Sequence, residues 1–348
     1  MTTLLVHTPA QAHTQQGHPE SHLRMERLLP TLDQFGVLGD LTAVSAPHAT
    51  TDQLRYAHLP ALVEKVRQTS QRGGGLLDHG DTYATAQSYD LARLAVGGCC
   101  EAVSQIVTGQ AQNGIALVRP PGHHAEFATI SGFCLFNNVA IAARHAQRVH
   151  GVRRVAIVDF DVHHGNGTQD IFYEDSSVLF VSTHLYMPRL FYPGSGAAQE
   201  VGAGFGQGYT LNVPFGPNVG DVGYGRTFKE LIGPKLAAFQ PELLLVSAGY
   251  DAHWQDPLAW AGLSLTGYAQ IVRQLVEMAD RLCNGRLLIV LEGGYHLEAL
   301  TFGVLNTVYA LLGRDQIEDP LGPMVEAEQD VSHLLAHLRQ RHFDDIAW

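Results

Sequence analysis

Five short apolar runs, each followed at once by polar side chains, constrain the fold of this chain more than any other feature. The runs are nearly continuous in apolar character and rich in β-branched residues. That pattern is typical of strands buried on both faces of a parallel sheet. They occupy residues 115–118, 155–158, 178–181, 243–246 and 287–291.

Helical patterns alternate with these runs, at residues 89–107, 137–149, 228–239, 266–282 and 296–312. Strand–helix alternation predicts an α/β domain with a doubly wound, mostly parallel sheet of about eight strands and helices on both faces. With 45% hydrophobic residues, the chain can build one large core, so we expect residues 1–348 to form a single domain. The motif-bearing part spans about 18–312, and 313–348 is expected to be a C-terminal helical segment.

Charge and cysteine content exclude several classes of function. The formal net charge of −12 argues against nucleic-acid binding, which needs a basic surface. It suits a cationic substrate such as a lysine-rich peptide or a polyamine, although solubility alone also explains it.

No apolar run reaches the roughly 20 residues that span a bilayer, and the start of the chain lacks a signal-peptide pattern. Four cysteines without a Cys-x-x-Cys pair predict reduced thiols and a cytoplasmic protein.

The polar clusters after the runs contain the residue types of a metal site. Asp159, Asp161 and His163 alternate along an extended segment, so their side chains share one side. Asp251 follows another run and offers a third protein ligand. Three ligands with one open position are typical of a catalytic zinc. The alternative is that these residues only cap strand ends, but the density of the run Asp159 to Gly167 favours a metal.

Two further clusters are weaker by themselves. His123 and His124 follow Pro-Pro-Gly, a rigid turn that presents both rings on a loop beyond a strand. Tyr295 follows a glycine pair that allows close backbone approach, so its hydroxyl could donate to an oxyanion. A packed aromatic side chain is the commoner explanation of such a tyrosine. Because ligands bind beyond the carboxyl ends of parallel strands, all these clusters are expected to converge.

The motifs resemble those of the arginase-fold histone deacetylases, in the expected order from about His18 to Tyr295. The stretch Gly132-Phe-Cys-Leu-Phe-Asn-Asn138 and the Gly-Asn-Gly after His164 are more similar to the class II branch and its bacterial relatives. The motifs that carry the resemblance are Pro120-Pro-Gly-His-His124, Gly132-Phe-Cys134, Asp159-x-Asp-x-His-His-Gly-Asn-Gly167, Pro193-Gly194, Gly249-Tyr-Asp251, Asp256-Pro257 and Gly293-Gly-Tyr295.

The resemblance implies a role for each matching position. Asp161, His163 and Asp251 would bind zinc, with ferrous iron as the alternative metal. In the catalytic set, His123 would pair with Asp159, His124 would pair with the amide of Asn166, and Tyr295 would bind the scissile carbonyl. The implied substrate-binding positions are Gly132, Phe133 and Tyr192 in the channel, Leu258 at its mouth, Asp81 at the rim and Arg24 at an inner cavity. The implied potassium positions are Asp159, Asp161, His163, Ser182 and Thr183.

The implied activity is zinc-dependent deacylation of N-acyl-lysine in peptides or proteins, or of a lysine-like small amide. Two alternatives share the motifs: an acetylpolyamine amidohydrolase and a catalytically dead module that binds acyl-lysine. A binuclear manganese ureohydrolase is disfavoured because His253 stands where that site would need a second carboxylate. The oligomeric state stays open, with a homo-oligomer as one option.

Overall fold

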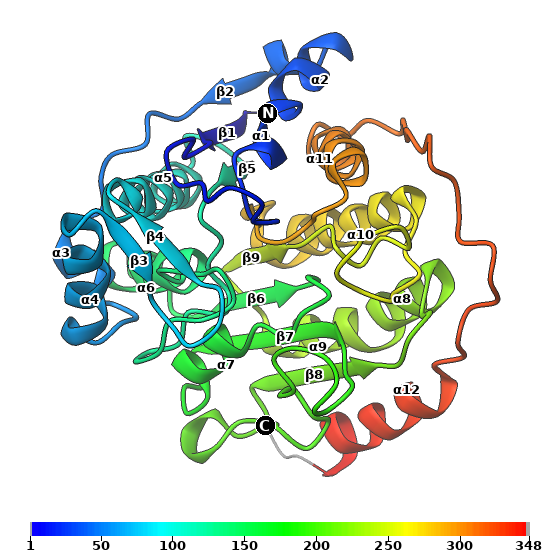
Figure 1. Cartoon of the computed structure of the whole chain (residues 1–348). Coiled ribbons are helices and arrows are strands. Elements are labelled where there is room, and N and C mark those ends of the chain that lie inside the picture. The colour runs from blue at the N-terminus through cyan, green and yellow to red at the C-terminus, as the bar shows by residue number, and fades with distance from the viewer. Residues whose placement is uncertain (1, 346–348) are drawn as a thin grey trace.

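Eight strands form the sheet that organises the protein, in the order β2-β1-β5-β10-β9-β6-β7-β8 (Figure 1). The structure is a computed structural model that describes residues 2–345. Every neighbouring pair in this sheet is parallel. The strands are β1 (Thr3–Thr8), β2 (Leu41–Ala43), β5 (Asn113–Val118), β6 (Val155–Asp159), β7 (Val178–Leu185), β8 (Thr210–Phe215), β9 (Leu243–Ala248) and β10 (Leu287–Leu291). A separate antiparallel pair joins β3 (Gly74–Leu76) to β4 (Tyr83–Thr85).

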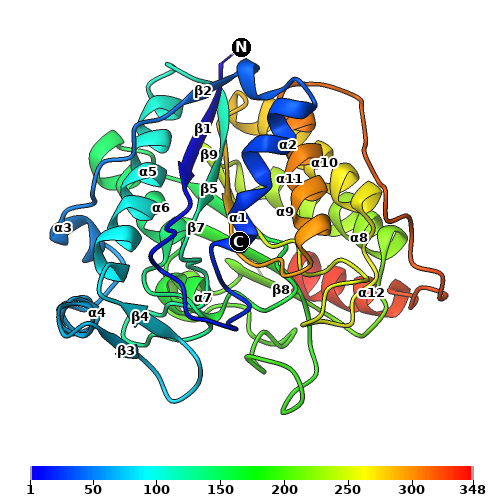
Figure 2. The same cartoon turned by 45° about the horizontal axis from the view of Figure 1, so that its top comes forward.

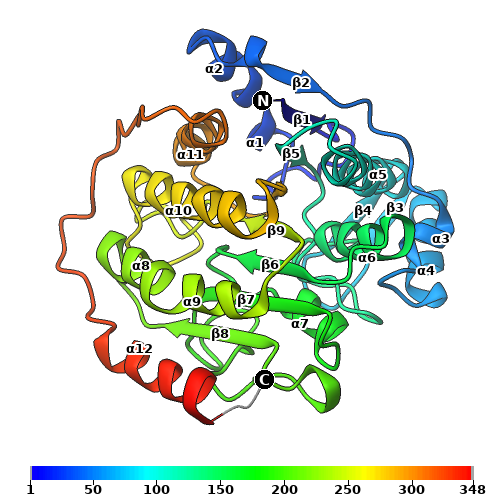
Figure 3. The ribbon, with the colours of Figure 1, turned by 180° about the vertical axis from the view of Figure 1, so that it is seen from behind.

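Helices cover both faces of the sheet (Figures 2 and 3). One group, α4 (Pro60–Gln71), α5 (Ser88–Val107) and α6 (Asn138–His150), shares a core with one face. The other face is covered by α1 (Leu23–Glu26), α2 (Leu28–Gln34), α8 (Asp221–Thr227), α9 (Gly233–Phe239), α10 (Leu265–Cys283), α11 (Leu297–Leu311) and α12 (Ser332–Arg339). Two short helices, α3 (Thr51–Leu54) and α7 (Asn166–Phe172), complete the set of α-helices.

Strand residues alternate between the two cores, which explains why the apolar runs are continuous. In β10, Leu287, Ile289 and Leu291 face one core, while Leu288 and Val290 face the other. All of them are buried, so a polar residue would be desolvated on either face. The α/β architecture with a doubly wound parallel sheet is confirmed, and the sheet is wholly parallel rather than mostly so.

Two helical expectations need correction. The helix expected at 228–239 is present but differs in type and start: residues 228–232 form a π-helix, which joins α8 to α9 without a break. Pro234, at the start of α9, has no amide hydrogen to donate, so the regular ladder cannot continue through it. Within the segment 313–348, residues 313–331 form an extended strap that Figure 1 shows along the outside of the fold. Helix begins only at Ser332, and residues 346–348 lie outside the described part.

Other expectations from the sequence concern the membrane and the thiols. Within residues 2–345, no helix combines the length and apolarity needed to cross a bilayer. Cys99, Cys100, Cys134 and Cys283 are all buried and carry free thiols.

Candidate active site

Two carboxylates and an imidazole converge where the adjacent strands β6 and β9 end. One ligand atom from each of Asp161, His163 and Asp251 lies within 4.8 Å of the others. His163 Nδ1 is 3.2 Å from Asp161 Oδ1 and 3.2 Å from Asp251 Oδ2. Both carboxylates are fully buried. The grouping that the sequence predicted across two strand ends is therefore present in the fold.

The surroundings of these carboxylates fit a divalent cation. Val162 N–H donates to Asp251 Oδ1, and Gly293 N–H donates to Asp161 Oδ2, so both groups are held in place. Gly249 packs so closely that an added Cβ would lie 2.0 Å from Asp161 Oδ2. Burial alone would lower the pKa of His163, but hydrogen bonds to Asp161 and Asp251 raise it to about 10. A positive charge is thus favoured here, and two carboxylates with one imidazole suit zinc or ferrous iron.

Two histidine rings stand beside this group on the loop after β5. His123 Nδ1 lies 3.0 Å from Asp159 Oδ2, and His124 Nδ1 lies 2.6 Å from Asn166 Oδ1. The amide nitrogen of Asn166 donates to Glu126 Oε1, which turns the amide oxygen towards His124. His124 Nδ1 must therefore carry hydrogen, and its Nε2 keeps a free lone pair.

The two histidines differ in charge because their partners differ. Burial alone would lower the pKa of His123, but the carboxylates of Asp159 and Asp161 outweigh it and raise the pKa to about 10. Burial also lowers the pKa of His124, and the neighbouring charges of His123 and His163 lower it further. Near neutral pH, His123 is the cationic ring and His124 the neutral one.

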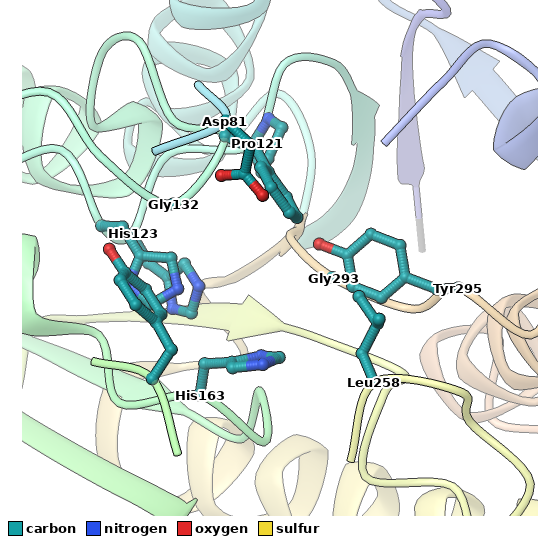
Figure 4. A pocket seen from close by; sticks show the side chains of 11 residues that line it. Asp81, Pro121, His123, Gly132, His163, Leu258, Gly293 and Tyr295 are labelled. Carbon is teal, nitrogen blue, oxygen red and sulfur yellow. The ribbon is translucent and has the colours of Figure 1, made fainter. Parts of the chain in front are cut away.

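Tyr295 lies on the loop after β10, across the pocket from the histidines. Figure 4 shows its hydroxyl directed into the pocket. Asp256 Oδ2 accepts hydrogen bonds from the backbone N–H groups of Tyr295 and His296, which ties two loops together. Burial raises the pKa of Tyr295 well above its usual value, so the hydroxyl stays protonated and can donate.

Arg24 lies beneath this loop instead of lining the pocket. Its guanidinium donates to the carbonyl oxygens of Glu292 and Gly294, at 2.5 and 2.8 Å. It also lies 5.0 Å from the centre of the Tyr295 ring and pairs with buried Glu20. Arg24 therefore supports the tyrosine loop from behind.

The pocket itself has a volume of about 200 Å³ and is mostly apolar around its polar base (Figure 4). Phe133 has a positive φ of 67°, and its N–H donates to Thr82 Oγ1, which fixes this ring at the wall. At Gly132, an added Cβ would lie 2.3 Å from the His124 ring, so only glycine fits there. The lining residues are Asp81, Pro121, His123, His124, Gly132, Phe133, His163, Tyr192, Leu258, Gly293 and Tyr295.

Four other residues that the sequence predicted for the site, Asp159, Asn166, Ser182 and Thr183, do not line the pocket. Asp159 and Asn166 lie behind the histidines, at hydrogen-bond distance from His123 and His124 respectively. Ser182 and Thr183 belong to β7, which continues to Leu185, beyond the strand end expected from sequence. Ser182 pairs in register with Asp159, and its hydroxyl lies 2.9 Å from His184 Nδ1.

Sequence reasoning gave no role to Glu292, Asp256 or Phe191. Buried Glu292 accepts from Gly122 N–H at 2.7 Å and His123 N–H at 3.1 Å, so it holds the histidine loop. Phe191 stacks on the His163 ring with centroids 4.9 Å apart. A carboxylate directly after a fully apolar strand was the available signal for Glu292, whereas the stacking of Phe191 has no sequence signature.

A metal-binding group, a neutral and a cationic histidine, and a tyrosine hydroxyl around one narrow pocket define the candidate centre of a metal-dependent amidohydrolase. A histone deacetylase domain model matches residues 18–311, and the chain belongs to this family. The expected family resemblance is thereby confirmed.

Individual relatives agree with this assignment. The chain is 40% identical over 314 residues to "Histone deacetylase 15" of Arabidopsis thaliana, covering 90% of this chain and 56% of the relative. It is 40% identical over 324 residues to the human "Polyamine deacetylase HDAC10", which covers 89% of this chain and 47% of that relative. The chain thus spans about half the length of these two relatives. The crystal structure of the HDA15 HD domain superposes with a TM-score of 0.89 at 37% identity, covering 99% of this chain and 94% of that one.

The ligand geometry predicts one divalent metal per chain. Asp251→Ala should lose both the metal and all turnover, because it removes a carboxylate from a three-ligand group. Asp221→Ala, which removes a partly buried carboxylate that accepts a hydrogen bond from Ser264, should keep the metal. Elemental analysis of both purified variants checks this. Two tightly bound transition metals per wild-type chain would contradict the prediction.

Proposed function

We propose that this protein hydrolyses N-acyl-lysine in peptides or proteins and releases the free amine and a carboxylate. One observation carries the proposal: His163, one member of the Asp161–His163–Asp251 group, lines a narrow, mostly apolar pocket that also contains His123, His124 and Tyr295. A neutral acyl amide can enter such a pocket without the desolvation cost of an ammonium group. The rings of Phe133 and Tyr192 would contact the methylenes of the lysine stem.

The bound metal would supply a Lewis acid for the carbonyl and lower the pKa of water. The protein then has three tasks. His124 Nε2 accepts a proton as the water attacks the carbonyl carbon. The Tyr295 hydroxyl donates a hydrogen bond to the oxygen that becomes negative. A protonated histidine returns the proton to the leaving nitrogen as the C–N bond breaks, which gives the free amine and the carboxylate.

We also propose a structural potassium ion at Asp159, Asp161, His163, Ser182 and Thr183. The in-register pairing of Asp159 with Ser182 brings both segments together and supports this.

The hydrogen-bond partners predict unequal roles for the two histidines. His124→Ala should reduce kcat more than His123→Ala, because Asn166 leaves the His124 ring neutral and free to accept a proton, whereas Asp159 favours a cation at His123. Steady-state kinetics at neutral pH, with metal content measured in parallel, tests the order. A larger loss for His123→Ala would reverse the assignment.

Removing one hydroxyl should show the contribution of Tyr295. Tyr295→Phe is expected to lower kcat by about a hundredfold or more while KM changes little, since a single oxyanion donor contributes on that scale. Thermal unfolding and metal content of the variant control for damage to the loop. Near-normal turnover would mean that Tyr295 only packs.

Leu258 predicts a preference for acyl-lysine over acetylpolyamines. It lines the pocket mouth with an uncharged side chain, which gives the inner ammonium of a polyamine no partner for its desolvated charge. The net charge of −12 attracts polyamines only through a screened field. We expect a higher kcat/KM for an acetyl-lysine peptide than for acetylspermidine, and a shift towards acetylspermidine in Leu258→Glu.

The uncharged variant Leu258→Gln is the matched control and should not shift the preference. If wild type favours acetylspermidine, the peptide assignment is wrong and the polyamine alternative replaces it. If Leu258→Glu behaves like Leu258→Gln, the charge at this position does not govern selectivity.

A further inference from the structure

Trp260 is an exposed indole on an anchored loop beside the pocket mouth. Its side chain is 60% exposed, although its backbone carbonyl accepts a hydrogen bond from Asn218 N–H at 2.9 Å. The other end of the loop is held by Asp256, which accepts from Leu258 N–H as well as from the Tyr295 loop. The indole is therefore presented to solvent from a fixed position next to the candidate active site.

The Phe191 ring contacts both this indole and His163 of the metal-binding group. The Phe191 ring stacks on His163 with centroids 4.9 Å apart and planes inclined by 9°. The centre of the Phe191 ring also lies 6.4 Å from the centre of the Trp260 ring. Leu258, two residues before Trp260, lines the pocket itself. The apolar surface of the pocket thus continues outward over these side chains.

We propose that Trp260, Phe191 and Leu258 form an apolar shelf that binds the apolar side chain of a residue next to the acyl-lysine in a peptide substrate. The inference rests on the proposed function and adds a sequence preference to it. Exposed tryptophan is a characteristic centre of binding surfaces, because a large rigid ring buries much apolar area at small entropic cost.

The two sides of the mouth differ in chemistry, which favours a peptide as the occupant. Asp81 lines the pocket with a carboxylate, and Figure 4 shows it across the pocket from Leu258. A carboxylate at a rim accepts backbone N–H groups of a peptide. A peptide held at Asp81 must cross the mouth, and that brings a flanking side chain within reach of the shelf. A second copy of the chain seated there would instead obstruct the channel.

The experiment compares two acetyl-lysine peptides that differ only beside the acetyl-lysine. In one peptide the flanking residues are Leu and Trp, and in the other they are Gly. For wild type, kcat/KM should be about three- to tenfold higher for the peptide with apolar flanks, because one aromatic contact contributes on that scale. The difference should lie in KM. Trp260→Ala should bring this ratio close to one, and Trp260→Phe should restore most of it. Phe205→Ala is the matched control and should keep the wild-type ratio. Phe205 is 89% exposed and precedes the amino end of β8, whereas Asn218, the backbone partner of Trp260, follows the carboxyl end of that strand.

Each outcome has a distinct meaning. A wild-type ratio near one, or an unchanged ratio in Trp260→Ala, overturns the shelf while leaving the deacylase intact. If no acyl-lysine substrate is hydrolysed, the proposed function fails, and calorimetric binding of the same peptides still tests the shelf. A dimer in sedimentation velocity that Trp260→Ala dissociates would replace the peptide by a second copy as the occupant.

Discussion

The carboxylates of Asp159, Asp161, Asp251 and Glu292 are all fully buried at one edge of the sheet, and this concentration of negative charge governs the local structure. An ionised carboxylate away from water is costly unless charges and hydrogen bonds compensate it. Here the compensation comes from His123 and His163 and from backbone N–H groups. A divalent cation would supply the positive charge that the protein lacks, so metal binding and the stability of this edge are linked.

The buried carboxylates also require the backbone of neighbouring loops to pass very close to them. An added Cβ at Gly293 would lie 2.1 Å from Asp251 Oδ2, much as one at Gly249 would meet Asp161. These glycines are therefore required by the carboxylates beside them, not by turns. Gly294, with a φ of 119°, has a different role, because it lets Tyr295 leave β10 abruptly and reach the far wall of the pocket.

Residues outside the pocket hold in place the loops that carry the candidate catalytic residues. Glu292 holds the histidine loop, Asp256 joins the tyrosine loop to the loop of Leu258 and Trp260, and Arg24 braces the tyrosine loop from below. Each uses backbone hydrogen bonds, so the side chains that face the substrate keep their own polar atoms available. This arrangement also couples the proposed shelf to Tyr295, because one carboxylate anchors both.

The sequence by itself determined the parallel α/β sheet, because strands buried on both faces require continuous apolar runs, and those runs are visible without a structure. It also predicted the metal-binding triad, since Asp161 and His163 follow one apolar run and Asp251 follows another. The extended conformation expected at 161–163 is wrong, because β6 ends at Asp159 and the chain bends there. Only the tertiary structure decided which loops meet. The orientation of Asn166 depends on Glu126, 40 residues away, and the position of Arg24 depends on carbonyl groups about 270 residues further along the chain. Likewise, the contact of Phe191 with both His163 and Trp260 joins three loops. Such long-range contacts depend on how loops pack in space, and no local periodicity encodes them.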